Sequence, residues 1–215
     1  LDAPDVGGGP WTEHAAKRLL REIGIPVTRE EEVREVEEAV EAAQRIGFPV
    51  VAKAAGIAHK TEVGGVRLGL ATEQAVREAA AEVLRLGAGL LVSEEVRGRL
   101  ELLVGAFRDA QFGVCGLLGL GGIWTEALGQ AVVLPGPGSE DVVRRALEDA
   151  PWGRLLLEDV RGVPLPLGRV TDVLFRLIDL VEGMPVEAIE INPLVVREDG
   201  VVAVDALLVP REGAR

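Results

Sequence analysis

The sequence predicts an α+β fold of two lobes with antiparallel sheets. Three observations support this class: helical patterns and β-branched runs alternate in the first half, several extended runs then follow one another, and the chain closes on a helix and a hairpin. The 215 residues are 48 % hydrophobic, which is enough to bury one substantial core or two smaller ones.

The first predicted elements are a linker, a helix, a strand and a second helix. Residues 1–10 are rich in Gly and Pro without an apolar period, which predicts a flexible segment. Residues 11–24 place apolar side chains on one helical face and end at a glycine. Residues 25–28 predict a short strand. Residues 30–46 carry apolar residues three and four apart in an acidic background, which predicts one amphipathic surface helix.

The middle of the chain predicts five strands and one helix. Two β-branched runs, residues 49–54 and 66–70, flank a glycine-containing loop, and a helix is expected at about 72–86. Three extended runs then follow in quick succession and predict an antiparallel meander closed by short turns. These runs are residues 90–96, 101–108 and 112–118, with turns at Gly98 and Asp109.

The last third predicts two helices and a hairpin after a glycine cluster. Helices are expected at about 139–148 and 169–182, separated by an irregular stretch rich in Gly and Pro. The final hairpin joins residues 188–196 to residues 201–209 through a turn at Asp199-Gly200.

Composition and charge argue against several kinds of partner. A formal net charge of −12 repels nucleic acid, and no basic patch offsets it. The apolar runs are short and broken by Gly or charge, so we expect no membrane span of about 20 residues. The single cysteine, Cys115, cannot form an internal disulfide, which favours a cytoplasmic location. Abundant charge with a single asparagine is typical of a thermophilic source.

The segment GFPVVAKAAGIAHKTEVGGVRLGL, residues 47–70, is the first candidate site. Lys53 near a strand end and Lys60 in the loop supply positive charge, and the paired glycines free backbone N–H groups for a polyphosphate. His59 can carry a phosphoryl group covalently near neutral pH. A surface loop with a tight glycine turn explains the same residues without a ligand. The segment contains neither GxxxxGK[ST] nor GxGxxG.

The C-terminal hairpin is the second candidate site. Glu190 and Asn192 share a strand face, and Asp205 follows on the next strand; carboxylate and amide oxygens suit Mg²⁺, which takes few protein ligands. A bend at Asn-Pro with an edge aspartate explains the same spacing. Glu101 is a lone carboxylate in an apolar strand, pointing either to water or into a site. Glu94 and Glu95, after an apolar run, are candidate partners for the amino group of a base, although acidic residues at strand ends are also common without a ligand.

Five ordered blocks resemble the ATP-grasp β subunit of ADP-forming acetyl-CoA synthetases, a relative of the succinyl-CoA synthetase β subunit. WTEHAAKRLLREIGIPV is similar to the first helix and strand of that family, and residues 47–70 to its PVVLK, HKS/T-D and GGV blocks. FRDAQFG and GLGGIWTEAL resemble DPQFG and GLGGIFVE, while EINPLVV and VDALLV resemble the EINPL and DA elements. The likeness runs from Trp11 to Val209.

The resemblance implies an ATP-grasp fold with a nucleotide site between its two lobes. It also implies the following division: a flexible segment at 1–10, a helix packing on the larger lobe at 11–24, a small lobe at 25–93 and a large lobe with the magnesium site at 94–215. His59 is implied as the phosphorylatable histidine. The implied nucleotide contacts are Lys53, Lys60, Gly64, Gly65, Glu94 and Glu101. The implied Mg²⁺ site is Asn192 and Asp205, with Glu190 nearby.

The implied activity is that of an acid–thiol ligase, the ADP-forming acetate–CoA ligase, of which this chain is one subunit or domain. A CoA-binding alpha subunit or domain would deliver a phosphoryl group to this chain, and ADP would accept it with Mg²⁺ as cofactor. The implied assembly is αβ or α₂β₂. The chain departs from the family where Leu100 separates Gly98-Arg99 from Glu101, and where Glu62 replaces an aspartate.

Two other functions fit parts of the pattern. One is a regulatory ATP-grasp domain of a fused protein acetyltransferase; the retained Lys53, His59, Asn192 and Asp205 argue against a degenerate site. The other is a carboxylate–amine ligase that acts alone, which has no use for a phosphohistidine.

Overall fold

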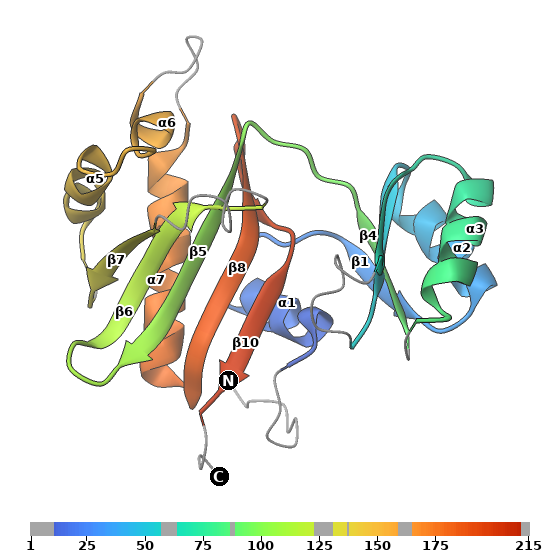
Figure 1. Ribbon diagram of the computed structural model, residues 1–215, viewed down its shortest axis with the longest axis horizontal. Coiled ribbons are helices and arrows are strands. Elements are labelled where there is room, and N and C mark those ends of the chain that lie inside the picture. Colours follow the sequence, from blue (N-terminus) through green and yellow to red (C-terminus); the bar gives the residue numbers. More distant parts are fainter. Residues whose placement is uncertain are drawn as a thin grey trace. The chain divides into compact units, whose positions relative to one another are not determined.

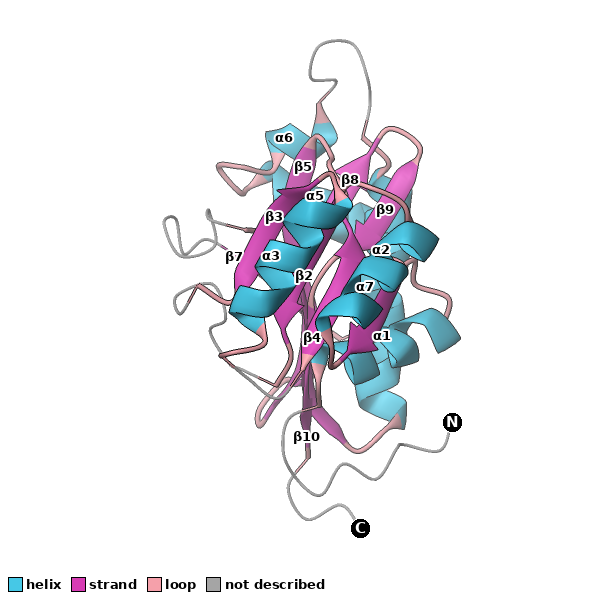
Figure 2. Cartoon of the chain, turned by 90° about the vertical axis from the view of Figure 1, so that its right-hand side faces the viewer, coloured by secondary structure: helices cyan, strands magenta, loops and turns pink. Residues whose placement is uncertain are grey.

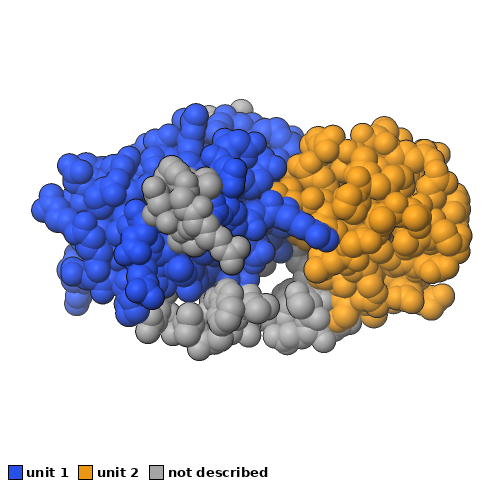
Figure 3. All heavy atoms as spheres, turned by 90° about the horizontal axis from the view of Figure 1, so that it is seen from above, with its two compact units in different colours: residues 1–11, 15–27, 97–215 blue, residues 12–14, 28–96 orange. Residues whose placement is uncertain are grey.

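The computed structural model describes residues 11–56, 64–86, 89–122, 131–136, 138–158 and 165–211. The chain divides into two compact units, coloured separately in Figure 3. Of the described residues, unit 2 takes 12–14 and 28–96, and unit 1 takes the rest. Within the described part of the chain, no helix is long and apolar enough to cross a membrane.

Unit 2 is a four-stranded antiparallel sheet with two helices on one face. Its strand order is β1-β4-β2-β3, and Figure 2 shows α2 and α3 side by side over the sheet. Alternate residues of β2 face the helices: Val50, Ala52 and Ala54 lie in the same core as the helix side chains. Lys53 therefore faces the opposite side of the sheet. The elements are β1 (Glu30–Val33), α2 (Val36–Ile46), β2 (Val50–Ala54), β3 (Val66–Leu70), α3 (Glu73–Val83) and β4 (Leu90–Glu94).

Local capping marks the start of both helices in unit 2. The Glu38 carboxylate accepts hydrogen bonds from the backbone N–H groups of Arg34 and Glu35, at 2.9 and 3.2 Å, just before α2 begins. The Thr72 hydroxyl accepts the Ala75 N–H at 3.2 Å and starts α3. The strands and helix expected at 49–54, 66–70 and 72–86 are thus confirmed, within a few residues at their ends.

Two expectations for residues 25–46 are wrong. Residues 30–33 are not the first turn of a helix over 30–46, because they form β1 and pair with β4, Glu30 opposite Ser93. The partner strand lies some 60 residues away, so helical spacing alone could not reveal this pairing. The strand expected at 25–28 is reduced to a single bridge between Val27 and Ala203.

Unit 1 is built on a sheet of order β10-β8-β5-β6-β7, with β9 also paired to β8. Helix α1 supplies its first residues to unit 2 and the remainder to unit 1. Figure 1 shows α7 running along one face of β5 and β6. The elements are α1 (Glu13–Glu22), β5 (Leu100–Asp109), β6 (Gly113–Leu120), β7 (Ala131–Pro135), α5 (Glu140–Glu148), α6 (Arg154–Leu157), α7 (Leu167–Gly183), β8 (Val186–Arg197), β9 (Gly200–Ala203) and β10 (Ala206–Pro210).

The core of unit 1 lies between α7 and the sheet. Leu174 and Ile178 of α7 pack so closely on Gly116 of β6 that an added Cβ would lie 3.0 Å from each side chain. On β8, Ile189 and Ile191 are buried in this core. The intervening Glu190 consequently projects from the opposite face of the sheet.

Three expectations for unit 1 need correction. The predicted three-stranded meander is wrong at its first turn, because β4 belongs to the sheet of unit 2 and only β5 and β6 form a hairpin. Gly98 therefore makes no hairpin turn; it lies against the backbone of Val196. Strand β7 and the short α6 were not expected. The strand expected at 201–209 is broken into β9 and β10 around Asp205.

Candidate functional site

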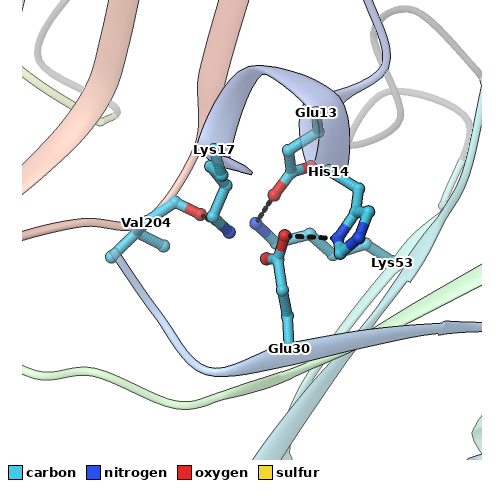
Figure 4. Close-up of polar contacts among 6 residues, drawn as sticks. All are labelled: Glu13, His14, Lys17, Glu30, Lys53 and Val204. Carbon is cyan, nitrogen blue, oxygen red and sulfur yellow. Dashed lines mark hydrogen bonds and ion pairs between the residues drawn. The ribbon is translucent and has the colours of Figure 1, made fainter. Parts of the chain in front are cut away.

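Lys53 is held by a carboxylate from the first helix. Its Nζ lies 2.7 Å from Oε1 of Glu13, and both side chains are less than a tenth exposed. The pair lies within unit 2, on the face of β2 that is turned away from α2 and α3. Figure 4 shows the two side chains meeting end to end. A buried cation is thus available here, already beside an opposite charge.

Two further polar contacts fix helix α1. Nδ1 of His14 lies 2.9 Å from Oε1 of Glu30, whose side chain is almost fully buried. Lys17, with no exposed surface, donates to the Val204 carbonyl at 2.9 Å (Figure 4). His14 is therefore held in a tertiary contact with the first residue of β1.

The paired glycines lie where the candidate phosphate loop returns to β3. Gly64 has φ +69°, a conformation that favours glycine, and its carbonyl accepts a hydrogen bond from Arg67. The Gly65 carbonyl accepts the Ala54 N–H at 2.7 Å, which ties the loop end to β2. His59 and Lys60 lie outside the described residues.

Glu94, expected near a base, contacts Arg29. Its carboxylate accepts the Arg29 backbone N–H and Nε–H, both at 2.9 Å. The next residue, Glu95, accepts the backbone N–H of Gly69 on β3 at 2.7 Å. Both acidic side chains therefore make structural contacts within unit 2.

Glu101 and Asn192 come together at the glycine turn after β6. The Asn192 Oδ1 atom accepts the backbone N–H of Gly122 at 3.0 Å. Gly122 has φ +61°, and a Cβ at this position would clash with the Glu101 carboxylate. Gly122 thus lies between the two predicted site residues, at the point where the described part of this segment ends.

Glu190, Asn192 and Asp205 form the second cluster of unit 1. The backbone N–H of Asn192 donates to the Asp205 carbonyl at 3.1 Å, which aligns β8 with the break between β9 and β10. Burial raises the pKa of the Glu190 carboxyl; a hydrogen bond with Asn192 acts in the opposite direction, and the Asp205 charge raises the pKa further. The two carboxylates are therefore close enough to repel each other.

A divalent cation would relieve this repulsion. Among the described residues, no group of three Asp, Glu, His or Cys side chains could hold a metal ion. Mg²⁺ does not need such a group, because it usually takes one or two carboxylates and completes its shell with water and substrate phosphates. The partly desolvated Glu190, close to Asp205, fits that requirement.

Sequence reasoning missed Glu13, Glu30 and Gly122 as site residues. Glu13 is a lone carboxylate at the start of a predicted helix, and Glu30 is the first of three consecutive glutamates. Their partners Lys53 and His14 are distant in sequence. Gly122 was visible only as a member of a glycine cluster. Each role depends on a tertiary contact that the spacing of residues in the sequence does not reveal.

Comparison with known proteins identifies relatives for nearly the whole chain. The model of the ATP-grasp domain family matches residues 3–209. The Archaeoglobus fulgidus protein "Acetate--CoA ligase [ADP-forming] II" is 35 % identical over 211 residues, which cover 94 % of this chain but 31 % of the relative. The beta subunit of "Acetate--CoA ligase [ADP-forming] I" from Pyrococcus furiosus is 31 % identical over 93 % of this chain and 91 % of the subunit.

Solved structures agree with these sequence matches. The dinucleotide-forming acetyl-coenzyme A synthetase 1 of Ca. Korarchaeum cryptofilum, in complex with coenzyme A and Ca-AMPCP, superposes with a TM-score of 0.89 and 31 % identity, covering 97 % of this chain and 96 % of that chain. A second structure of that enzyme contains Mg-AMPPCP, with its phosphohistidine segment pointing towards the nucleotide binding site. It gives a TM-score of 0.80 and 33 % identity over 93 % of this chain and 92 % of that chain.

Proposed function

The chain belongs to the ATP-grasp domain family and is a homologue of the beta subunits of ADP-forming acetate–CoA ligases, and on that basis we propose that it transfers a phosphoryl group between a histidine and adenine nucleotide with Mg²⁺. The observation that carries the proposal is the cluster of Glu190, Asn192 and Asp205 on one sheet, joined to the glycine turn at Gly122. In this proposal the chain acts as the nucleotide-handling subunit or domain of an acid–thiol ligase.

The proposed roles follow from charge and placement. Lys53 contacts nucleotide phosphate, because its ammonium is fixed in direction and nearly excluded from water. Gly64 and Gly65, at the end of the loop that carries Lys60, cover the phosphates with backbone N–H groups. Asn192, Asp205 and Glu190 would hold Mg²⁺, which neutralises charge on the phosphate oxygens when bound. Glu94 and Glu101 are proposed to face the nucleotide.

The reaction asks mainly for positioning and charge neutralisation. His59 is the proposed phosphoryl carrier. When ADP is the acceptor, the N–P bond of phosphorylated His59 breaks while a terminal oxygen of the ADP β-phosphate forms the new O–P bond. The imidazole nitrogen keeps the electron pair of the broken bond. Lys53 stabilises charge on the transferred group, and no further covalent chemistry by this chain is required.

Phosphorylation of His59 tests the proposal. The chain and its CoA-binding partner are incubated with Mg²⁺ and γ-labelled ATP, and acid-labile label on this chain is measured. We expect label that ADP removes and that is missing in His59→Ala. The matched control is His14→Ala, which removes the other histidine of the chain; it should keep the label. Tight Mg-ATP binding without any label would reject the relay and indicate a regulatory nucleotide-binding domain.

The partner is proposed to be a CoA-binding alpha subunit or domain, in an αβ or α₂β₂ assembly. The chain spans about a third of the A. fulgidus relative but nine-tenths of the P. furiosus subunit, which is consistent with a partner that is either another part of the same chain or a separate subunit. We also propose a cytoplasmic location, which is supported by the single cysteine, Cys115, being free and buried.

A further inference from the structure

The contact between Lys53 and Glu13 raises a question about nucleotide binding. The carboxylate lies 2.7 Å from the ammonium that the proposed function assigns to phosphate, and Glu13 and Lys53 are 40 residues apart in sequence. Both side chains are less than a tenth exposed, so solvent screens their attraction weakly. The first turn of α1 therefore presents a negative charge at the place where a phosphate needs a positive one.

A charge in this position affects the two states of the protein differently. Without nucleotide, Glu13 compensates the buried Lys53 and lowers the free energy of the empty state. With nucleotide bound, the phosphates compensate the same ammonium, and the Glu13 carboxylate then repels them at short range. Both effects favour the empty state over the bound state. A ligand binds more weakly when a group of the protein stabilises the unbound state selectively.

We propose that Glu13 competes with nucleotide phosphate for Lys53 and so weakens nucleotide binding. The inference rests on the proposed role of Lys53 as a phosphate ligand and assigns a role to Glu13, for which the sequence predicted none. Such a competitor is useful in a phosphoryl relay, because tightly held ADP or ATP would delay product release. Glu13 is a positioning residue in this account, since it acts through Lys53.

Glu13→Gln provides the direct test. Glutamine keeps the size and a hydrogen-bond acceptor for Lys53 but removes the negative charge. We expect the Kd for Mg-ADP, measured by isothermal titration calorimetry, to fall about tenfold. The matched control is Glu37→Gln, which removes an exposed ion pair with Arg77 on the two helices of the same unit. The control should leave the Kd unchanged.

A double-mutant cycle separates competition from a general change in the fold. Lys53→Gln should weaken Mg-ADP binding, and in that background Glu13→Gln should tighten binding less than it does in the wild type, because only the direct repulsion between the carboxylate and the phosphates is left to remove. A Glu13→Gln variant with an unchanged or higher Kd, while Lys53→Gln weakens binding, overturns the competition but keeps the proposed function. If Lys53→Gln binds Mg-ADP as tightly as the wild type, the proposed contact of Lys53 with nucleotide phosphate is wrong. The competition by Glu13 is then rejected with it.

A second variant covers the case in which Glu13→Gln does not fold. Glu13→Asp keeps the charge but withdraws it from the ammonium by one methylene, so we expect a Kd about two- to threefold lower than that of the wild type. Circular dichroism would verify that the variant is folded before titration. A folded Glu13→Asp with an unchanged or higher Kd contradicts the proposal.

Discussion

The side-chain oxygen of Asn192 accepts the backbone N–H of Gly122 at 3.0 Å, across 70 residues of sequence. The same asparagine is hydrogen-bonded to the Glu190 carboxyl. One amide therefore connects the glycine turn after β6 with the acidic cluster on β8. A change at Asn192 should affect both the turn and the proposed Mg²⁺ ligands.

Replacing Asn192 by alanine should reduce Mg²⁺-dependent nucleotide binding. The variant loses the acceptor for Gly122 and the hydrogen bond with Glu190, and each lost hydrogen bond costs about 1 kcal/mol. We expect the Kd for Mg-ADP to rise at least about tenfold, while binding of ADP in EDTA changes little. Calorimetric titrations with and without Mg²⁺ measure both values. Equal losses in the two conditions would contradict a role in holding the ion.

Replacing Glu190 by glutamine should stabilise the metal-free chain at neutral pH. The folded pKa of Glu190 is raised above the usual 4.5, mainly by burial, so the folded state binds more protons than the unfolded state in the window above 4.5. The contribution of this carboxyl to stability is present below that window and is lost as the pH rises through it. Urea unfolding in EDTA at pH 4, 6 and 8 should show that the free energy of unfolding of the variant, relative to that of the wild type, increases with pH. A variant that is less stable at pH 8 would refute this.

The hairpin between β5 and β6 should weaken in acid through Asp109. Hydrogen bonds from the backbone N–H groups of Phe112 and Gln111, at 2.9 and 2.8 Å, lower the pKa of this carboxyl from the usual 3.8. Its contribution is present above pH 3.8 and is lost as the pH falls through the lowered value. Asp109→Ala should therefore lower the thermal unfolding midpoint at pH 7 but have less effect near pH 2. If the unfolding midpoints of the variant and the wild type differ by the same amount at both pH values, the loss is due to the turn geometry and not to the charge of Asp109.

Gly121 and Gly183 should respond in opposite ways to alanine. A Cβ on Gly121 would lie 2.6 to 3.0 Å from the backbone of Leu102, so Gly121→Ala should cost about 1–3 kcal/mol of unfolding free energy. Gly183 ends α7 with open space around it, so Gly183→Ala should be neutral or stabilise by up to about 1 kcal/mol. Chemical denaturation of both variants gives the two values. A Gly121→Ala variant as stable as the wild type would mean that the turn after β6 can shift.

Most of the secondary structure could be predicted because its signals are local. The apolar spacing of α7 and the β-branched run of β2 depend on neighbouring residues only. The sheet to which a strand belongs could not be predicted from such local signals, because strand pairing joins distant segments. Strand β4 follows the same pattern as β5 yet pairs with β1 and β2. The edge strands β1 and β7 were not predicted from the sequence for the same reason.

The residues of the candidate site show the same difference: some could be recognised from the sequence, and others only from the fold. Asn192 and Asp205 were visible as rare or isolated polar residues in apolar strands, and the resemblance gave them a role. Glu13 was not visible, because a glutamate in the first turn of a helix is common for reasons of the helix dipole. Only the fold brings it to Lys53.

Unit 2 has the topology of an insertion. Its main stretch, residues 28–96, enters through β1 and leaves through β4, and these are antiparallel neighbours joined by the bond from Glu94 N–H to the Arg29 carbonyl at 2.9 Å. Such a stretch can be exchanged between homologues as a cassette, by gene recombination or in the laboratory. The cassette is incomplete, however, since Glu13 and His14, which contact Lys53 and Glu30, lie upstream on α1. A graft that respects the chemistry of Lys53 must therefore carry the first turn of α1 from the same parent.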